Sequence, residues 1–176
     1  MAIRVRPAHP RDLAGILEVY NHYVGNTPVT FEVTPVAPED RRPWLAEHTS
    51  GGRHRLIVAE STPDRIVGWA STSSFRPRAA YATTVEASVY CRPEVQGRGL
   101  GTRLYTHLFR QIRDEDVERI VAGITLPNTP SVRLHRRLGF RRVGTFHRVG
   151  RKFDRYWDVA WFERPLRLDG PQVPAA

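Results

Sequence analysis

The chain reads Gln96-Gly97-Arg98-Gly99-Leu100-Gly101, with three glycines in five positions, between a stretch expected to form a strand and one expected to form a helix. Glycine permits a close approach of the backbone to a ligand. The free N–H groups of a first helical turn then point at that ligand, and the helix dipole favours an anion there. The stretch therefore predicts a turn that binds a diphosphate. A glycine-rich connector that binds nothing is the alternative.

Two other phosphate-binding motifs do not fit this turn. A dinucleotide-binding fingerprint has the spacing G-x-G-x-x-G. Counted from Gly97, this spacing requires a glycine at the position that Thr102 occupies. A Walker loop requires Gly-Lys-Ser/Thr, and the turn contains no lysine. The spacing thus excludes both of these nucleotide-binding loops.

Outward from the turn, the spacing of apolar residues predicts the other elements. Before the turn we expect strands at residues 2–6, 55–60, 66–72 and 84–91, a helix from Pro10 to Gly25 and a weaker helix at 39–48. After it we expect helices at 100–112 and 131–138 and strands at 119–125, 140–149 and 156–162. This order indicates an α/β fold, with a mixed sheet and helices on both of its faces.

The composition is that of one folded domain. The 176 residues are 40% hydrophobic and 26% charged. We expect a single domain over residues 1–168. The last residues, 169–176, contain two prolines and a glycine, and we expect them to form a frayed, disordered tail.

The formal net charge of +9 invites a nucleic-acid interpretation. Of the 27 basic residues, however, only Lys152 is a lysine, and the 26 arginines are spread along the whole chain. We favour a solvated basic face that attracts small anions, with no nucleic acid as a partner. A basic nucleic-acid-binding module is the alternative.

The sequence also bears on compartment and metal binding. No apolar run approaches the ~20 residues that span a bilayer, and residues 1–13 lack the apolar core of a secretory signal. The single cysteine, Cys91, excludes an intramolecular disulfide, and the histidines show no metal-ligand spacing. We therefore expect a cytoplasmic protein without a membrane partner and without a metal.

The glycine-rich turn resembles the pyrophosphate-binding turn of the GNAT superfamily of N-acetyltransferases. That turn has the pattern Gln/Arg-x-x-Gly-x-Gly/Ala, which Gln96, Gly99 and Gly101 meet. The segment 126–140, with Asn128 ahead of a helix that ends in Leu-Gly-Phe, resembles the second signature of the superfamily. Within it, the chain resembles phosphinothricin and methionine sulfoximine acetyltransferases over residues 3–166. The supporting stretches are Ile16-Leu-Glu-Val-Tyr-Asn-His-Tyr23, Asn26-Thr-Pro-Val-Thr-Phe31, Thr84-Val-Glu-Ala-Ser-Val-Tyr90 and Gly101-Thr-Arg-Leu-Tyr-Thr-His-Leu108.

The resemblance implies a mostly antiparallel, twisted sheet with an open V-shaped groove between its central strands. It implies acetyl-CoA as the co-substrate, with backbone groups of residues 88–90 pairing with the pantetheine arm like an added strand. The N–H of Val89 would then stabilise the thioester oxyanion. The cofactor-binding residues expected in this way are Ser88, Val89, Tyr90, Gln96, Gly97, Arg98, Gly99, Leu100, Gly101, Asn128 and Ser131.

Glu86 is the candidate general base. A free amine is mostly protonated near neutral pH, so a base must take a proton before the nitrogen can attack a thioester. Strand alternation puts Glu86 on the face opposite Val85 and Ala87, and a carboxylate in an apolar strand is costly without a partner or a function. The resemblance assigns the matching glutamate as the catalytic base. A structural carboxylate bonded to an arginine or tyrosine is the alternative.

His135 is the second catalytic candidate. It follows Ser131 by one helical turn. Many superfamily members have tyrosine here, and the resemblance implies a histidine that protonates the leaving thiolate or assists deprotonation. A capping or core histidine is the alternative.

The resemblance implies a small amine substrate with an acidic group, bound by Arg76 and Arg78 and lined by Tyr81 and Phe31. A solvated basic loop is the alternative for the two arginines. The herbicide-inactivating enzymes typically have lysine at the position of Arg76 and tryptophan at that of Thr83, so this loop departs from them. The expected reaction is acetylation of the α-amino group of a glutamate-analogue amino acid by a homodimer. The alternatives are acetylation of another amine, such as a protein N-terminus or an antibiotic, and a non-catalytic CoA-binding module.

Overall fold

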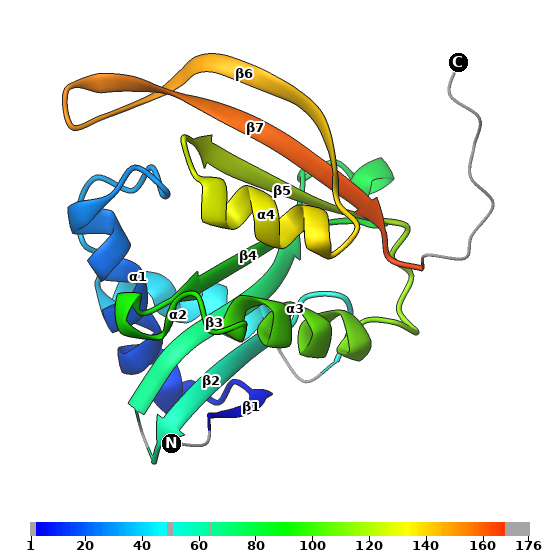
Figure 1. Ribbon diagram of the computed structural model, residues 1–176. Coiled ribbons are helices and arrows are strands. Elements are labelled where there is room, and N and C mark those ends of the chain that lie inside the picture. Colours follow the sequence, from blue (N-terminus) through cyan, green and yellow to red (C-terminus); the bar gives the residue numbers. More distant parts are fainter. Residues whose placement is uncertain (1–2, 49–50, 64, 168–176) are drawn as a thin grey trace.

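The computed structural model describes residues 3–48, 51–63 and 65–167, so the tail expected at 169–176 lies outside the described residues. Within them, one seven-stranded sheet has the strand order β1-β2-β3-β4-β5-β7-β6 (Figure 1). Its strands are β1 (Arg4–Pro7), β2 (Leu56–Thr62), β3 (Arg65–Ser74), β4 (Thr84–Cys91), β5 (Arg119–Leu126), β6 (Arg141–Lys152) and β7 (Arg155–Pro165). The helices are α1 (Leu13–Asn26), α2 (Pro38–Glu47), α3 (Leu100–Gln111) and α4 (Thr129–Arg137).

The sheet opens between β4 and β5. All other neighbouring strands are antiparallel, but these two are parallel and share only three residue pairs, from Thr84 with Arg119 to Glu86 with Val121. Both strands then continue without pairing to each other. In Figure 1, β4 stays with β2 and β3, whereas β5 stays with β6 and β7. This confirms the mixed, mostly antiparallel α/β sheet with an open groove between its central strands.

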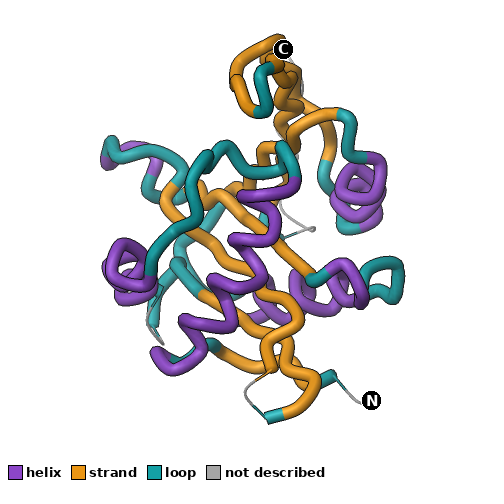
Figure 2. Tube along the Cα trace, turned by 90° about the vertical axis from the view of Figure 1, so that its left-hand side faces the viewer, coloured by secondary structure: helices purple, strands orange, loops and turns teal. Residues whose placement is uncertain are grey.

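Helices pack on both faces of the sheet, as the view of Figure 2 shows. On one face, Ile16 and Tyr20 of α1 pack against the buried Trp69 of β3. On the other, Leu104 and Leu108 of α3 form part of the larger core. The apolar stripes predicted from helical spacing are therefore the buried faces of these two helices.

Several element boundaries differ from the sequence expectation by one to three residues, including those of α4 and of the β6–β7 hairpin. Helix α4 begins at Thr129, two residues early, because the Asn128 Oδ1 atom accepts from the Ser131 N–H at 3.2 Å and caps the helix. Strands β6 and β7 extend further than expected and meet at Phe153 and Asp154. Both turn residues have positive φ, at 52° and 55°, a conformation that aspartate adopts more readily than phenylalanine.

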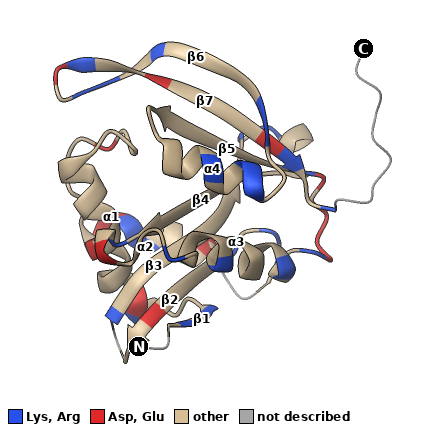
Figure 3. Ribbon diagram, in the orientation of Figure 1, with Lys and Arg blue, Asp and Glu red and all other residues tan. Residues whose placement is uncertain are grey.

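Basic side chains occur on many elements of the described chain, including α3, α4 and the β6–β7 hairpin (Figure 3). None of the described helices combines the length and the apolar character needed to cross a membrane.

Candidate functional site

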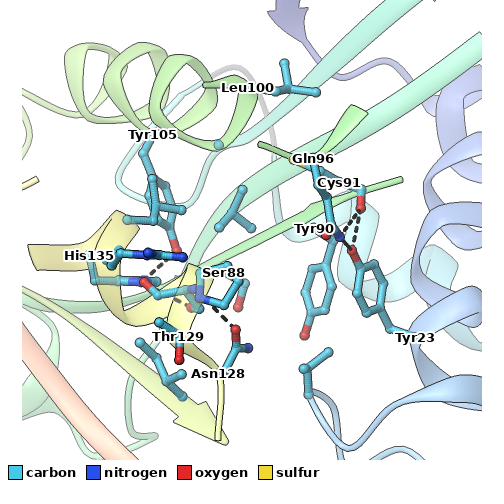
Figure 4. Close-up of a pocket in the computed structure, with 18 of the residues that line it drawn as sticks. Tyr23, Ser88, Tyr90, Cys91, Gln96, Leu100, Tyr105, Asn128, Thr129 and His135 are labelled. Atoms are coloured by element: carbon cyan, nitrogen blue, oxygen red, sulfur yellow. Dashed lines mark hydrogen bonds between the residues drawn. The ribbon is translucent and has the colours of Figure 1, made fainter. Parts of the chain in front are cut away.

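A groove of about 860 Å³ lies where β4 and β5 separate. It is lined by the second half of β4, the turn after it, the start of α3, the end of β5 and most of α4 (Figure 4). The last turns of α1 close one end. The groove thus has sheet edges on two sides and a helix N-terminus at each of α3 and α4.

The glycine-rich turn lies at the N-terminus of α3. Gly97 and Gly99 have φ of 73° and 76°, a left-handed conformation that glycine adopts without strain. Gly99 is the N-cap residue and leaves the first-turn N–H groups without a side-chain cap, and the first turn contains no acidic residue. Gly101 serves packing instead, because a Cβ atom there would lie 3.0 Å from Leu134 of α4. Arg98 is exposed and does not line the groove.

Gln96 anchors the turn rather than pointing freely at a ligand. Its Nε2 atom donates to the hydroxyl of Tyr23 at 2.6 Å and approaches the carbonyl oxygen of Cys91 at 3.4 Å. The Tyr23 hydroxyl in turn donates to the same carbonyl. Tyr23 therefore joins α1 to the end of β4, a role that sequence reasoning missed because its two partners lie more than 65 residues away.

The backbone of β4 presents alternate residues to the groove. The N–H of Arg92 donates to the carbonyl of Val67 in β3 at 2.8 Å. By strand alternation, the backbone groups of Ser88 and Tyr90 also face β3, and those of Val89 face the groove. All three residues line the groove, but only Val89 directs its backbone groups into it, and pairing with a pantetheine arm stays a prediction.

Glu86 lies at the last residue pair between β4 and β5. Its side chain is half-buried on the sheet face that also carries Ser88 and Tyr90, opposite the core-facing Val85. Burial raises the pKa of Glu86, and the nearby charge of Arg76 lowers it in part. Among the described residues, no hydrogen bond ties this carboxylate to an arginine or a tyrosine.

His135 is 3% exposed and its two ring nitrogens have different partners (Figure 4). Nδ1 lies 2.8 Å from the carbonyl oxygen of Ser131, which can only accept, so Nδ1 carries the proton. Nε2 is then the acceptor and lies 3.3 Å from the hydroxyl of Tyr105. Burial lowers the pKa of His135 and favours its neutral form, whereas it raises the pKa of Tyr105 well above its ordinary value.

Tyr105 is therefore a groove residue that the sequence analysis did not single out. It lies on the buried stripe of α3 next to Leu104, where an aromatic residue indicates core packing. Its hydroxyl gains significance only from His135 on α4, which the sequence separates from it by 30 residues.

Two of the residues expected to bind the amine, Arg76 and Tyr81, do not line the groove and lie around Phe75. The Arg76 guanidinium lies 5.0 Å from the centre of the Phe75 ring, and the rings of Tyr81 and Trp161 each lie 5.8 Å from it. Arg76 also acts electrostatically on Glu86. The structure thus brings Arg76, Tyr81 and Glu86 into one region.

The other two predicted substrate residues lie apart from this cluster. Phe31 is 38% exposed and rests on Gly150 of β6. Arg78 is exposed, and within the described part of the chain it has no hydrogen bond or ion pair to the others.

The described residues contain no group of three histidine, cysteine, aspartate or glutamate side chains arranged to hold a metal ion. Burial raises the pKa of the Cys91 thiol to about 12, so this cysteine stays protonated near neutral pH.

Comparisons with known proteins agree with this geometry. Residues 5–161 match the family model described as an acetyltransferase (GNAT) domain. The chain is 52% identical over 165 residues to a phosphinothricin N-acetyltransferase of Streptomyces coelicolor, covering 93% of this chain and 96% of the relative. It is 37% identical over 169 residues to an L-methionine sulfoximine/L-methionine sulfone acetyltransferase of Pseudomonas aeruginosa, covering 96% of each.

A solved structure is also similar: a GNAT superfamily phosphinothricin acetyltransferase from Sinorhizobium meliloti in complex with acetyl-CoA. It superimposes with a TM-score of 0.87 at 32% identity, covering 94% of this chain and 89% of that one. The family model covers most of the chain, and the relatives are similar over nearly its whole length. The protein is therefore an acetyltransferase that belongs to the GNAT family.

Proposed function

We propose that this enzyme transfers the acetyl group of acetyl-CoA to the α-amino group of a small glutamate-analogue amino acid of the phosphinothricin or methionine sulfoximine type. The observation that carries the proposal is the loss of β4–β5 pairing immediately after Glu86. It leaves the Val89 backbone open to the groove while the Glu86 carboxylate lies on the other face of the same strand.

The groove fits acetyl-CoA by the chemistry of its walls. Gly97 and Gly99 give a diphosphate access to the uncapped N–H groups of α3. The Val89 backbone faces the space for the pantetheine arm, and the Asn128 amide and Ser131 lie across from it on α4. Once bound, the co-substrate supplies an activated thioester.

In the proposed reaction, Glu86 accepts a proton from the substrate ammonium, directly or through water. The Val89 N–H donates to the carbonyl oxygen as it becomes negative. The amine nitrogen forms the new amide bond and releases its second proton to solvent, the carbon–sulfur bond breaks, and the thiolate takes up a proton from solvent. Before the reaction the Tyr105 hydroxyl donates to the Nε2 atom of neutral His135, whose Nδ1 stays bonded to Ser131, and the hydroxyl then turns its one proton to the departing sulfur.

The substrate class rests on Arg76 beside Glu86 and on the names of the relatives. A guanidinium binds a carboxylate, phosphinate or sulfoximine oxygen by directed hydrogen bonds. We assign Arg78, Tyr81 and Phe31 to the same substrate.

A thiol-release assay with phosphinothricin, methionine sulfoximine and a set of common amino acids tests the proposal. We expect the two analogues to be acetylated with the highest kcat/KM. Equal or higher turnover of a polyamine, an aminoglycoside or a peptide N-terminus would overturn the substrate class.

Tyr105→Phe is expected to lower kcat about tenfold, because the departing sulfur loses one hydrogen bond worth about 1–1.5 kcal/mol. The ring and its stacking on Phe109 remain. Steady-state kinetics, with calorimetric titration of CoA, would show the fall in kcat with unchanged CoA affinity. An unchanged kcat would remove Tyr105 from the reaction.

We further propose that the enzyme is a cytoplasmic homodimer that associates through the β6–β7 hairpin. Val143, Phe146 and Val149 of β6 are each more than half exposed on an edge strand of the sheet. Such an exposed apolar edge is commonly covered in the native assembly. Light scattering is expected to give the mass of two chains for the parent protein and of one chain for Phe146→Glu. A monomeric parent would contradict the proposal.

A further inference from the structure

Lys152 is the one lysine among the 27 basic residues of the chain, and it is buried, with 4% of its surface exposed at the end of β6. Its Nζ atom donates to the backbone carbonyl of Thr30 at 2.8 Å. Burial lowers the pKa of Lys152, and the nearby charge of Glu32 offsets part of this effect by favouring the ammonium. An ammonium is compact, whereas a guanidinium is planar and brings five donors, so a small buried site facing one carbonyl suits lysine.

Thr30 has a second contact, toward the other half of the molecule. Its Oγ1 atom is 2.6 Å from the hydroxyl of Tyr20 in α1. The Tyr20 ring meets the ring of Tyr90 edge-on, with 5.2 Å between centroids. Thr30 therefore links the β6–β7 hairpin, through Lys152, to α1 and β4 on the opposite side of the opening in the sheet.

Phe31 strengthens this link by packing. A Cβ atom on Gly150 would lie 2.3 Å from the Phe31 ring, so the ring lies directly against the backbone of β6. Val29 of the same loop lines the groove. In Figure 1 the tip of the hairpin extends over the loop between α1 and α2.

We propose that Lys152 is a positioning residue for the amine substrate. Its bond to Thr30 holds the α1–α2 loop against the hairpin, beside Tyr90 on the sheet face that carries Glu86. This inference rests on the proposed function, since it concerns binding of the amine and not of acetyl-CoA.

Lys152→Met keeps the length and apolar volume of the side chain but removes the donor. We expect the KM for the amine to rise about tenfold, the loss that one charged hydrogen bond represents, while the KM for acetyl-CoA changes less than about twofold. Arg151→Met is the matched control. It removes the same charge from the neighbouring residue, whose exposed side chain bonds to the exposed Asp154, and both KM values are expected to stay unchanged.

Gly150→Ala tests the same link by a different route, because its Cβ atom displaces Phe31. We expect the same selective rise in the KM for the amine. Amide hydrogen exchange of residues 27–33, measured without ligand, is expected to accelerate in both variants, with thermal unfolding as the check on folding. If Lys152→Met does not fold, the KM values and the hydrogen exchange of Gly150→Ala test the inference alone.

An unchanged KM for the amine in the folded variants, an equal rise in both KM values, or unchanged exchange in residues 27–33 would overturn the inference. Because the exchange is measured without substrate, it tests the contact even if the enzyme acetylates none of the proposed amines.

Discussion

Glu86→Gln is expected to lower kcat by about 10²–10³-fold while CoA binds as before, since proton transfer by a positioned base contributes about that much. Glutamine keeps the size of the side chain but cannot accept the proton. The carboxylate has no hydrogen-bond partner in the described structure whose loss would disturb the fold. Steady-state kinetics and calorimetric titration of CoA measure the two effects.

The pH profile gives the same prediction a second readout. The pKa of Glu86 is raised by burial above its ordinary value of 4.5. The protonated acid cannot serve as a base, so the rate is expected to fall as the pH drops through this raised pKa. That limb should disappear in Glu86→Gln.

Glu163→Gln is the control for this pair. Glu163 of β7 lies opposite Val121, the residue that pairs with Glu86, so both carboxylates lie on one face of the sheet. Glu163 bonds to Arg141, and its substitution should leave the rate unchanged. Equal rates for parent and Glu86→Gln would remove Glu86 from the mechanism.

Gly99→Asp is expected to weaken CoA binding by about 30- to 100-fold. Aspartate tolerates the left-handed conformation that Gly99 adopts. Its Cβ atom would meet no other residue within 4 Å, so the strain of the substitution stays in the backbone of this turn. Its charge would repel the diphosphate by about 2–3 kcal/mol after allowance for solvent.

Gly99→Asn separates charge from shape in this test. Asparagine has nearly the same shape and the same backbone strain at this position, but it carries no charge. We expect it to weaken CoA binding by less than about fivefold, as measured by calorimetry, with both variants unfolding at the same temperature, somewhat below that of the parent because of the shared backbone strain. Equal losses for aspartate and asparagine would show that this turn does not hold an anion.

Periodicity predicted the order of helices and strands because burial of one face dictates it. Leu104 and Leu108 recur at helical spacing, and both are fully buried. The glycine-rich turn could also be predicted, since two of its glycines adopt a backbone conformation that is unfavourable for most other residues. Where conformation or burial is decided within a few neighbours, the sequence carries the signal.

The remaining parts of the site depend on contacts between distant segments. Tyr105 is a core aromatic by spacing, and only folding brings its hydroxyl to His135. Lys152 lies 122 residues from Thr30, and nothing in its neighbours marks it as buried. The direction of the Val89 backbone follows from the register of β4 on β3, which no local pattern specifies.

The break between β4 and β5 affects the directions from which the two substrates can reach the site. Tyr105 and His135 line the groove at this break, whereas Glu86, in the last residue pair before it, lies on the opposite face of β4 from the core-facing Val85. In the proposed reaction, acetyl-CoA and the amine would reach this break from opposite faces of the sheet, so neither would block the release of the other. Such a layout favours simultaneous residence of donor and acceptor over a relay through an acetylated side chain.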